Sequence, residues 1–381
     1  MTAPSLTVVW DPRFRSYDMG PDHPFNEASR EYAVRLLESS LTPGQRNAVD
    51  WRREVDPAGT SSLLSFHDAG YLEQIRAASA SADGRPLDGG DTLSFPGCFE
   101  ASARIVGGTE RAVRVVLERG GSAFAPAGGL HHAHRDRASG FCIFNDVAVG
   151  IAAALEAGRR VAYVDIDVHH GDGVMYGFYR SGRVLDIDFH QDGRTIFPGT
   201  GDVSETGAGD GAGLKVNVPL PPEAGDEALV PLVRRVVPPL IREFRPDILV
   251  VQHGIDGHWG DPLARLQYTP EGYAAVDRLL IDLARESGGR LVVTGGGGYQ
   301  PSNVARTLAR TAFQLAGVAL PSGDLPLPEE WRVEYFEEFG SPAPLRWVDP
   351  PGLVRSPWGP ASEERIVRSI EEALGRRLPV P

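Results

Sequence analysis

An apolar segment of the chain, VAYVDIDVHHGDG at residues 161–173, ends in a cluster of ionisable side chains. Because side chains alternate along a strand, Asp165, Asp167 and His169 would project to the same side. Carboxylates this close together repel one another unless a cation neutralises them. The spacing therefore predicts a platform for a divalent metal ion. The alternative is a group of solvated residues at a strand end, or a buried Asp–His pair that ties loops together.

A third ligand is expected from another strand end, since a catalytic zinc site usually combines three protein ligands with one open position. Asp167 and His169 would supply two ligands, and Asp256 in the segment GIDGHWGDPL is the best-placed third. His258 and Asp261 lie in the same loop and are rival ligands. For both rivals we favour the simpler interpretation that their hydrogen bonds order the loop.

Two adjacent histidines, His131 and His132, lie in the glycine-containing segment GGLHHA. In an irregular loop both rings can face one cavity if a second group orients each of them. Asp165 and Asp172 are free to do so, because a carboxylate that accepts the Nδ1 proton fixes the tautomer and raises the basicity of the imidazole. The alternative is a pair of surface histidines, which the neighbouring metal platform disfavours.

A run of glycines precedes Tyr299 in the segment GGGGY at residues 295–299. Its spacing matches neither the dinucleotide-binding fingerprint nor the P-loop, and no Lys-Ser/Thr pair follows it. We expect the glycines to let the backbone pack closely near the metal while the Tyr299 hydroxyl faces the cavity. A phenol beside a polarised carbonyl can stabilise a developing oxyanion. The alternative is that Tyr299 only fills space.

The elements that must position these residues alternate along the chain. Apolar, β-branched runs predict strands at residues 6–10, 122–125, 161–168, 184–189, 247–252 and 291–295. Helical periodicity predicts helices at residues 27–40, 98–119, 143–158, 226–244, 271–287 and 302–317. This alternation predicts an α/β fold, a single domain with a central, mostly parallel sheet flanked by helices. Right-handed crossovers would bring the strand carboxyl ends to one edge, where ligands bind in such sheets.

The C-terminal part of the chain differs in composition from the rest. We expect a catalytic domain over residues 1–320 and a C-terminal extension over residues 321–381, packed on or appended to the same domain. The extension is rich in Pro, Trp and Glu. This is typical of an irregular segment that wraps a domain or binds a partner, and one closing helix is predicted at residues 362–376.

Bulk composition excludes several classes of function. The net charge of −13 argues against a general nucleic-acid-binding surface and suits a neutral or cationic substrate. No apolar run reaches the ~18 residues that span a bilayer, and the N-terminal residues lack the pattern of a signal peptide. Only two cysteines occur, Cys98 and Cys142, which argues against a disulfide framework. We expect a cytoplasmic protein that binds neither membrane nor nucleic acid; no sequence feature sets its oligomeric state.

Six motifs together resemble those of the zinc-dependent histone deacetylase superfamily: PAGGLHHA, SGFCIFND, YVDIDVHHGDGV, FPGTGDV, QHGIDGHWGDPL and GGGGY. The superfamily also contains acetylpolyamine amidohydrolases. The segments DMGPDHPFN and DTLSFPGCFEAS make this chain most similar to its bacterial acetoin utilization branch. The resemblance covers roughly residues 6–318 in the family's order and implies an arginase/deacetylase-like fold.

The resemblance also implies a role for each residue of the centre. One catalytic Zn²⁺, or Fe²⁺ in the cell, would be held by Asp167, His169 and Asp256. His132, oriented by Asp172, matches the general base that takes a proton from the attacking water. His131, oriented by Asp165, matches a second histidine that acts as electrostatic partner or proton donor. Tyr299 matches the residue that polarises the scissile carbonyl.

Further positions are implied for the substrate and for a structural cation. The residues matched to substrate contacts, including two aromatic tunnel walls, are Asp91, Gly140, Phe141, Phe197, Leu263 and Gly297. A structural potassium ion is implied at Asp165, Asp167, His169, Asp188 and Phe189. Two positions depart from the family pattern: Ser29 stands where an arginine is common, with Arg30 beside it, and Asp188 stands where serine is common.

The implied reaction is the hydrolysis of N-acetyl-lysine in proteins. A closely related alternative is an acetylpolyamine amidohydrolase that acts on small cationic amides. An arginase-like ureohydrolase with two manganese ions would need a second Asp-x-Asp, where this chain has Asp256-Gly257-His258. A non-catalytic protein that only binds an acyl ligand is disfavoured, because the full set of expected catalytic residues is present.

Overall fold

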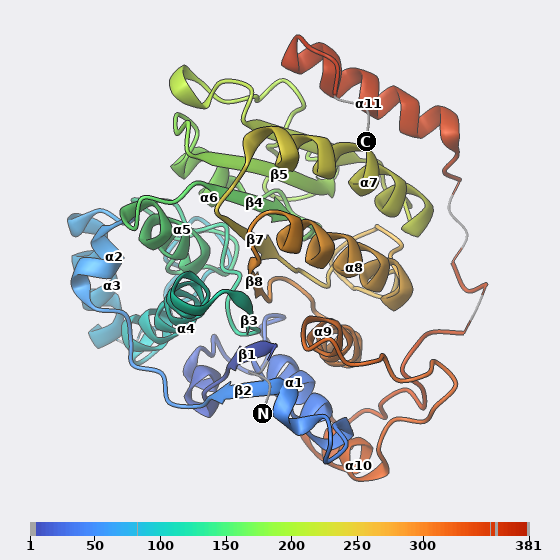
Figure 1. The fold of residues 1–381 in the computed structure, drawn as a ribbon. Coiled ribbons are helices and arrows are strands. Elements are labelled where there is room, and N and C mark those ends of the chain that lie inside the picture. Colours follow the sequence, from blue (N-terminus) through green and yellow to red (C-terminus); the bar gives the residue numbers. More distant parts are fainter. Residues whose placement is uncertain (1–4, 82, 351, 355–356, 379–381) are drawn as a thin grey trace.

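The fold is built around a sheet of eight strands, seen in a computed structural model that describes residues 5–81, 83–350, 352–354 and 357–378 (Figure 1). In spatial order the strands are β2 (Val49–Arg52), β1 (Leu6–Val9), β3 (Gly121–Ala125), β8 (Arg290–Thr294), β7 (Ile248–Gln252), β4 (Val161–Asp165), β5 (Val184–Gln191) and β6 (Lys215–Leu220). Each of these neighbouring pairs is parallel. The predicted α/β class is confirmed, and all strand carboxyl ends meet at one edge.

The central strands are the apolar runs expected from the sequence. All five residues of β4 are buried, because helices cover both faces of the sheet. This strand ends at Asp165, earlier than the predicted 161–168, so Asp167 and His169 lie in the loop beyond it. The sequence did not predict β2 and β6, the two edge strands. Polar residues interrupt both of them, and β6 contains Pro219, which an edge strand tolerates.

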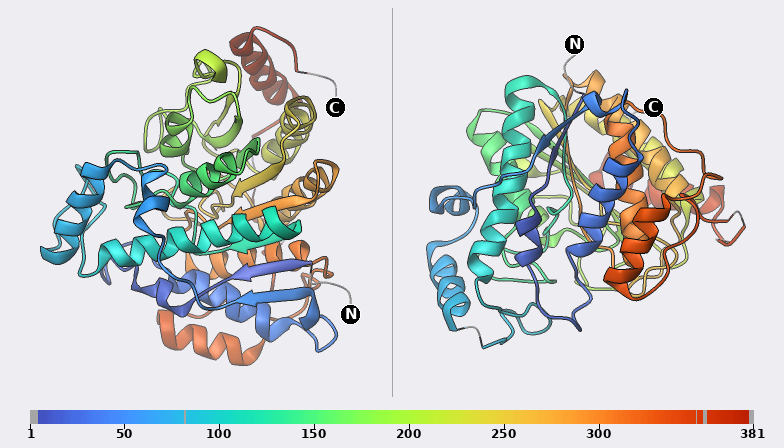
Figure 2. Two further views of the ribbon diagram at one scale, coloured as in Figure 1. Left: turned by 60° about the vertical axis from the view of Figure 1, so that its left-hand side comes forward. Right: turned by 90° about the horizontal axis from the view of Figure 1, so that it is seen from below.

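Helices cover the two faces of the sheet unequally, as the views in Figures 1 and 2 show. One face carries α4 (Cys98–Arg119) and α5 (Asp146–Glu156). The other carries α1 (Ala28–Ser40), α9 (Pro301–Leu315), α8 (Pro270–Glu286) and α7 (Asp226–Phe244). All six match predicted helices. Helix α3 (Ala69–Ser81) and the short helices α2 (Thr60–Leu64) and α6 (Asp172–Gly177) complete this part.

Local sequence explains where these helices begin. The Asn145 side chain accepts a hydrogen bond from the backbone of Ala148 and so caps α5. Thr269 caps α8 in the same way, and Pro270 occupies the first helical position, where no N–H is needed. Among the helices that the structure describes, none combines the length and the apolar character needed to cross a bilayer.

The C-terminal extension is more regular than its composition predicted. Residues 329–339 form a helix, α10 (Glu329–Phe339), which corrects the expectation of an irregular segment there. Trp331 packs edge-on against Tyr32 of α1, with ring centroids 5.9 Å apart, and its indole N–H donates to the Tyr32 carbonyl at 2.9 Å. The predicted closing helix is present as α11 (Pro360–Leu374) and packs on α7 and β6. Residues 351, 355–356 and 379–381 lie outside the described residues.

Candidate active site

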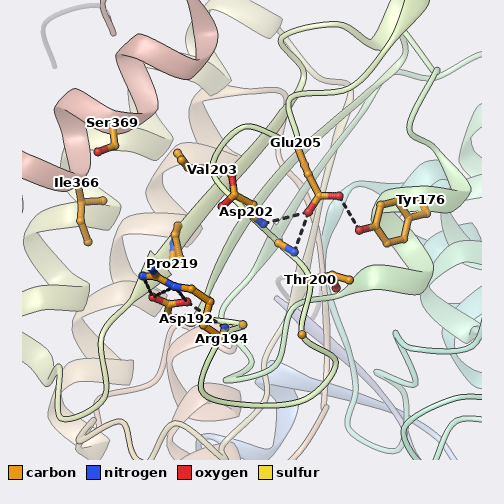
Figure 3. A pocket seen from close by; sticks show the side chains of 13 residues that line it. Tyr176, Asp192, Arg194, Thr200, Asp202, Val203, Glu205, Pro219, Ile366 and Ser369 are labelled. Carbon is orange, nitrogen blue, oxygen red and sulfur yellow. Dashed lines mark hydrogen bonds and ion pairs between the residues drawn. The ribbon is translucent and has the colours of Figure 1, made fainter.

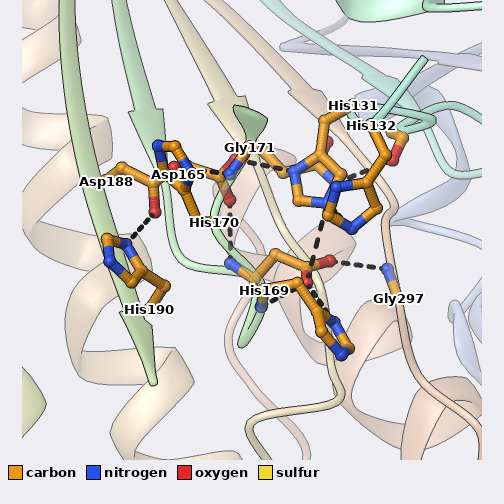
Figure 4. Close-up of polar contacts among 12 residues, drawn as sticks. His131, His132, Asp165, His169, His170, Gly171, Asp188, His190 and Gly297 are labelled. Atoms are coloured by element: carbon orange, nitrogen blue, oxygen red, sulfur yellow. Dashed lines mark hydrogen bonds and ion pairs between the residues drawn. The ribbon is translucent and has the colours of Figure 1, made fainter. Parts of the chain in front are cut away.

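The predicted chemistry-bearing residues meet at the carboxyl edge of the sheet (Figure 4). The loop after β3 carries His131 and His132, the loop after β4 carries Asp167 and His169, and Asp172 begins helix α6 directly after that loop. Asp256 follows β7 and the glycine run follows β8. Four parallel strands that are neighbours in the order β3, β8, β7 and β4 thus bring together segments far apart in the sequence.

Asp167, His169 and Asp256 form a buried cluster with the geometry of a metal site. One potential ligand atom from each lies within 4.8 Å of the other two. His169 Nδ1 is 3.0 Å from Oδ2 of Asp256 and 3.3 Å from Oδ1 of Asp167. The remaining carboxylate oxygens are held by backbone amides, Val168 N donating to Asp256 Oδ1 and Gly297 N to Asp167 Oδ2.

The electrostatics of this cluster favour a cation between the carboxylates. Burial alone would lower the pKa of His169, but hydrogen bonds and charge from Asp167 and Asp256 raise it to about 10. The pocket therefore stabilises positive charge strongly. Gly297 leaves room for this, because a Cβ at that position would overlap Oδ2 of Asp256. Two carboxylates and an imidazole form a donor set that fits a divalent metal ion such as Zn²⁺.

The rival ligands have other partners. The imidazole of His258 donates from Nε2 to Asp349 at 2.9 Å and accepts at Nδ1 from the Asn303 side chain at 3.0 Å. Asp261 accepts from the backbone N–H groups of Leu263 and Tyr299, at 3.0 and 2.8 Å. Both residues order the loop, in line with the simpler interpretation of the sequence.

Each of the tandem histidines is oriented by its own carboxylate. His131 Nδ1 donates to Asp165 Oδ2 at 2.8 Å, and His132 Nδ1 donates to Asp172 Oδ1 at 2.7 Å. The two Nε2 atoms lie 3.1 Å apart, so at most one of them carries a proton directed at the other. His134, which the sequence analysis missed, donates to the other oxygen of Asp172 at 3.0 Å. The segment HHAH, in which His134 follows the tandem pair by two residues, is the sequence feature that could have indicated this contact.

The two tandem rings have opposite pKa shifts. For His131, burial lowers the pKa, but the charges of Asp165 and Asp167 outweigh it and raise the pKa to about 10. For His132, burial and then the charge of His131 lower the pKa to about 4, against the opposing effect of Asp172. The pair therefore holds one positive charge, on His131, and keeps a neutral His132 beside it.

A cavity of 910 Å³ opens above this centre, and its walls include His132, His169 and Tyr299. The other predicted substrate residues that line it are Asp91, Gly140, Phe141, Phe197 and Leu263. Gly297 does not line it and lies instead against the carboxylates of the metal cluster. Phe141 packs edge-on against Tyr299 and Phe197 edge-on against His132, with ring centroids 5.8 and 5.1 Å apart.

One glycine in the cavity wall is required by close packing. The backbone of Gly140 has φ +53°, and a Cβ there would collide with the rings of His132 and Phe197. The chain can therefore bring Phe141 into the wall only if the preceding residue lacks a side chain. This fixes the aromatic walls against the ring of His132.

Arg30 is a second residue whose place the sequence did not reveal. Its buried guanidinium donates to the carbonyl of Gly296, directly before the backbone amide that holds Asp167. The family's usual arginine position is Ser29 in this chain, and its hydroxyl donates to the Asn26 carbonyl at 2.9 Å. A buried arginine beside the glycine run is thus present one residue later in the chain, at Arg30.

The residues matched to a structural cation surround a buried charge network beside the tandem histidines. Asp188 accepts from His190 Nδ1 at 2.8 Å and from Gly171 N at 2.7 Å. Burial lowers the pKa of His190, but the charge of Asp188 outweighs it and raises that pKa. Asp188, which stands where the resemblance makes serine common, therefore has a buried histidine partner. His170 packs nearby and its Nδ1 is 2.8 Å from the Thr200 hydroxyl.

A second cavity, of 510 Å³, lies between the loop after β5 and helix α11 (Figure 3). Its carboxylates are already partnered. Glu205 accepts from the Tyr176 hydroxyl at 2.6 Å and from Gly201 N at 2.9 Å, and Asp192 pairs with Arg194. Among the residues described there, no set of unpartnered groups converges, so the chemistry is concentrated in the first cavity.

Comparison with known proteins shows the family of the chain. The family model described as "Histone deacetylase domain" matches residues 23–315. The acetoin utilization protein AcuC of Bacillus subtilis (strain 168) is 34% identical over an alignment that covers 96% of each chain. The AcuC protein of Staphylococcus xylosus is 33% identical, with 87% of this chain and 88% of that protein covered. Histone deacetylase 6 of Arabidopsis thaliana is 32% identical and covers 99% of this chain and 78% of its own length.

Proposed function

Because this chain belongs to the histone deacetylase family and resembles its acetoin utilization members, we propose that it hydrolyses N-acetyl-lysine side chains of proteins at a zinc ion. The acetyl amide and one water would give a free lysine amine and acetate; a longer acyl-lysine would release the corresponding longer carboxylate. The observation that carries the proposal is that three groups of side chains come together at the 910 Å³ cavity. These are the Asp167–His169–Asp256 cluster, the two His–Asp pairs and Tyr299.

In the proposed reaction the metal ligands and the general base have separate roles. Asp167, His169 and Asp256 would hold Zn²⁺, with Fe²⁺ as the alternative because imidazole suits both ions. When bound, the ion supplies a Lewis acid that polarises the acyl carbonyl and makes water more acidic. His132 lines the cavity with Nδ1 committed to Asp172, so Nε2 is its basic atom. To take the proton of the attacking water, this Nε2 exchanges its 3.1 Å contact with His131 Nε2 for the water. Asp172 then stabilises the imidazolium.

Tyr299 and His131 act on the developing charge. The Tyr299 ring lines the cavity on the side of His169, with centroids 6.4 Å apart, so its hydroxyl can donate to the oxyanion of the tetrahedral intermediate. His131, cationic beside Asp165, is the electrostatic partner of this centre. One of the two histidines returns a proton to the departing amine. The proton taken from water can thus return to the amine through the histidines of the same centre.

The shape of the cavity supports an acyl-lysine substrate. Phe141 and Phe197 form apolar walls that fit the methylene stem of lysine, and Asp91 lies where a carboxylate can bind the substrate backbone. Small acetylated polyamines are the second candidate, because the net charge of −13 favours cationic substrates. The proposal places the protein in the cytoplasm, and the two unpaired buried cysteines are in keeping with a reducing compartment.

A structural potassium ion belongs to the same proposal, at Asp165, Asp167, His169, Asp188 and Phe189. The backbone carbonyls of Asp167 and His169 accept no hydrogen bond from any residue that the structure describes. Carbonyl oxygens with free lone pairs beside the carboxylates of Asp165 and Asp188 are suitable ligands for a monovalent cation. The ion would neutralise part of this buried negative charge.

A parallel turnover assay tests the function. Zinc-loaded protein is incubated with acetyl-lysine peptides, longer acyl-lysine peptides and acetylpolyamines, and amine release is measured for each. We expect the highest kcat/KM on an acyl-lysine peptide and a large loss for His132→Ala. Undiminished hydrolysis by zinc-loaded His132→Ala would remove His132 as the base, and preference for acetylpolyamines would select the second candidate.

A further inference from the structure

The C-terminal extension reaches the active-site loop through one carboxylate, that of Asp349. Its Oδ2 accepts from His258 Nε2 at 2.9 Å and from the indole N–H of Trp259 at 2.7 Å. Its Oδ1 accepts from Arg306 of helix α9 at 2.8 Å. The Asp349 side chain is only 11% exposed and that of Arg306 only 1%, so the ion pair is largely removed from water.

The segment that carries Asp349 is itself fixed to the body of the protein. Leu327 N donates to the Leu345 carbonyl at 2.8 Å, and Arg306 also donates to the Arg346 carbonyl at 3.3 Å. The ring of Trp347, 2% exposed, packs edge-on against Phe313 of α9 with centroids 5.9 Å apart. Asp349 therefore presents its carboxylate from a supported position.

The anchored loop, residues 254–263, carries residues of the proposed active site. His258 accepts at Nδ1 from Gly260 N at 3.1 Å and from the Asn303 side chain at 3.0 Å, which places its proton on Nε2, facing Asp349. The His258 carbonyl accepts from Asp261 N at 2.9 Å. Asp261 in turn holds the backbone N–H of Tyr299 at 2.8 Å. The same loop contains Asp256 of the metal cluster and Leu263 of the cavity wall.

We propose that Asp349 is a positioning residue, which anchors the loop 254–263 to helix α9 and thereby holds Asp256 and Tyr299 in place. Its carboxylate offers two acceptor oxygens to three donors that come from the loop and from α9, and no other residue described in the structure joins His258, Trp259 and Arg306. The extension is then part of the active-site architecture rather than an appendage. The inference rests on the proposed function for the roles of Asp256 and Tyr299, but the anchoring itself does not.

Hydrogen exchange in the full-length protein tests the anchoring without any assay of activity. In Asp349→Asn, peptides that cover residues 254–263 should exchange on the order of ten- to a hundredfold faster, since two charge-assisted hydrogen bonds to the loop are weakened. Peptides from β4 and β7 should be unchanged. The affinity for Zn²⁺, measured by competition with a chelator, should fall roughly tenfold or more. With turnover as a further readout, kcat should fall more than KM changes.

Asp324→Asn is the matched control, because Asp324 lies in the same extension, pairs with an arginine at 3.6 Å and is 94% exposed. Equal exchange and equal Zn²⁺ affinity in the two variants would overturn the proposal. Should Asp349→Asn fail to fold, Trp259→Phe tests the anchoring instead. This variant removes one hydrogen-bond donor to Asp349 and leaves the Arg306–Asp349 pair intact. Unchanged exchange of the loop in Trp259→Phe would then contradict the proposal. Faster exchange in a protein without deacetylase activity would support the anchor and refute the proposed function instead.

Discussion

The surroundings of a histidine, rather than its burial, distinguish the proposed catalytic residues of this protein. His132 and His169 line the large cavity and each has one ring nitrogen committed to a carboxylate. His253, directly after β7, is just as buried, but its Nε2 donates to Asp277 of α8 at 2.7 Å, and it does not line that cavity. The same Asp–His pairing thus occurs both in the core and at the proposed active site.

Replacing Tyr299 by phenylalanine removes one hydroxyl from the cavity wall. We expect Tyr299→Phe to keep its metal content and melting temperature, because the ring contacts with Phe141 and His169 persist. The kcat should fall by ~10²-fold or more, since a donor to the oxyanion is lost. Steady-state kinetics with an acetyl-lysine peptide measures this, and a variant with near wild-type kcat would refute the oxyanion role.

At the scale of elements, the sequence predicted those helices and strands whose apolar residues follow a regular local pattern. The buried strands and the long helices have clear apolar periodicity, and the strand ends indicated where Asp167, His169 and Asp256 come together. Helix α10 was missed because the Pro- and Glu-rich composition of the extension outweighed the spacing of Trp331 and Tyr335, which is one helical turn. The contact between Arg30 and Gly296 could not be predicted, because 266 residues separate them and only the packing of α1 on α9 brings them together.

Helix α10 should contribute to the stability of the whole domain through its aromatic face. Trp331→Ala removes a side chain that is 2% exposed, and we expect the free energy of unfolding to fall by about 3–5 kcal/mol. Val333→Ala is the control on the same helix, because Val333 is 53% exposed and its loss should cost little. Denaturant unfolding of both variants measures the difference. Equal stabilities would show that α10 is only loosely attached.

At the scale of the whole molecule, a buried carboxyl group links stability to pH. Glu27, at the start of α1, is 2% exposed, and neither side-chain oxygen has a hydrogen-bond partner among the described residues. Burial raises its pKa from 4.5 to about 8, although the charge of Arg30 opposes this. The folded protein therefore keeps Glu27 protonated at pH values where the unfolded chain has released the proton.

The sign of the resulting pH dependence follows from this difference. Below pH 4.5 both states hold the proton and Glu27 costs no stability, whereas between pH 4.5 and about 8 unfolding releases it. Over this range the contribution of Glu27 to the free energy of unfolding should fall by about 1.4 kcal/mol per pH unit. Glu27→Gln removes the effect, so its stability relative to wild type should increase from pH 5 to pH 8. A constant difference in urea unfolding across this range would contradict the assignment.

The central claim is that one divalent metal ion at Asp167, His169 and Asp256 enables this chain to release acyl groups from lysine. It is tested most directly by titrating metal-depleted protein with Zn²⁺ while acetate release from an acetyl-lysine peptide is measured. We predict that the rate rises with added Zn²⁺ and reaches its maximum at about one equivalent per chain, and that Asp256→Asn abolishes this response. No acetate release at full zinc occupancy, or a requirement for two ions per chain, would contradict the account.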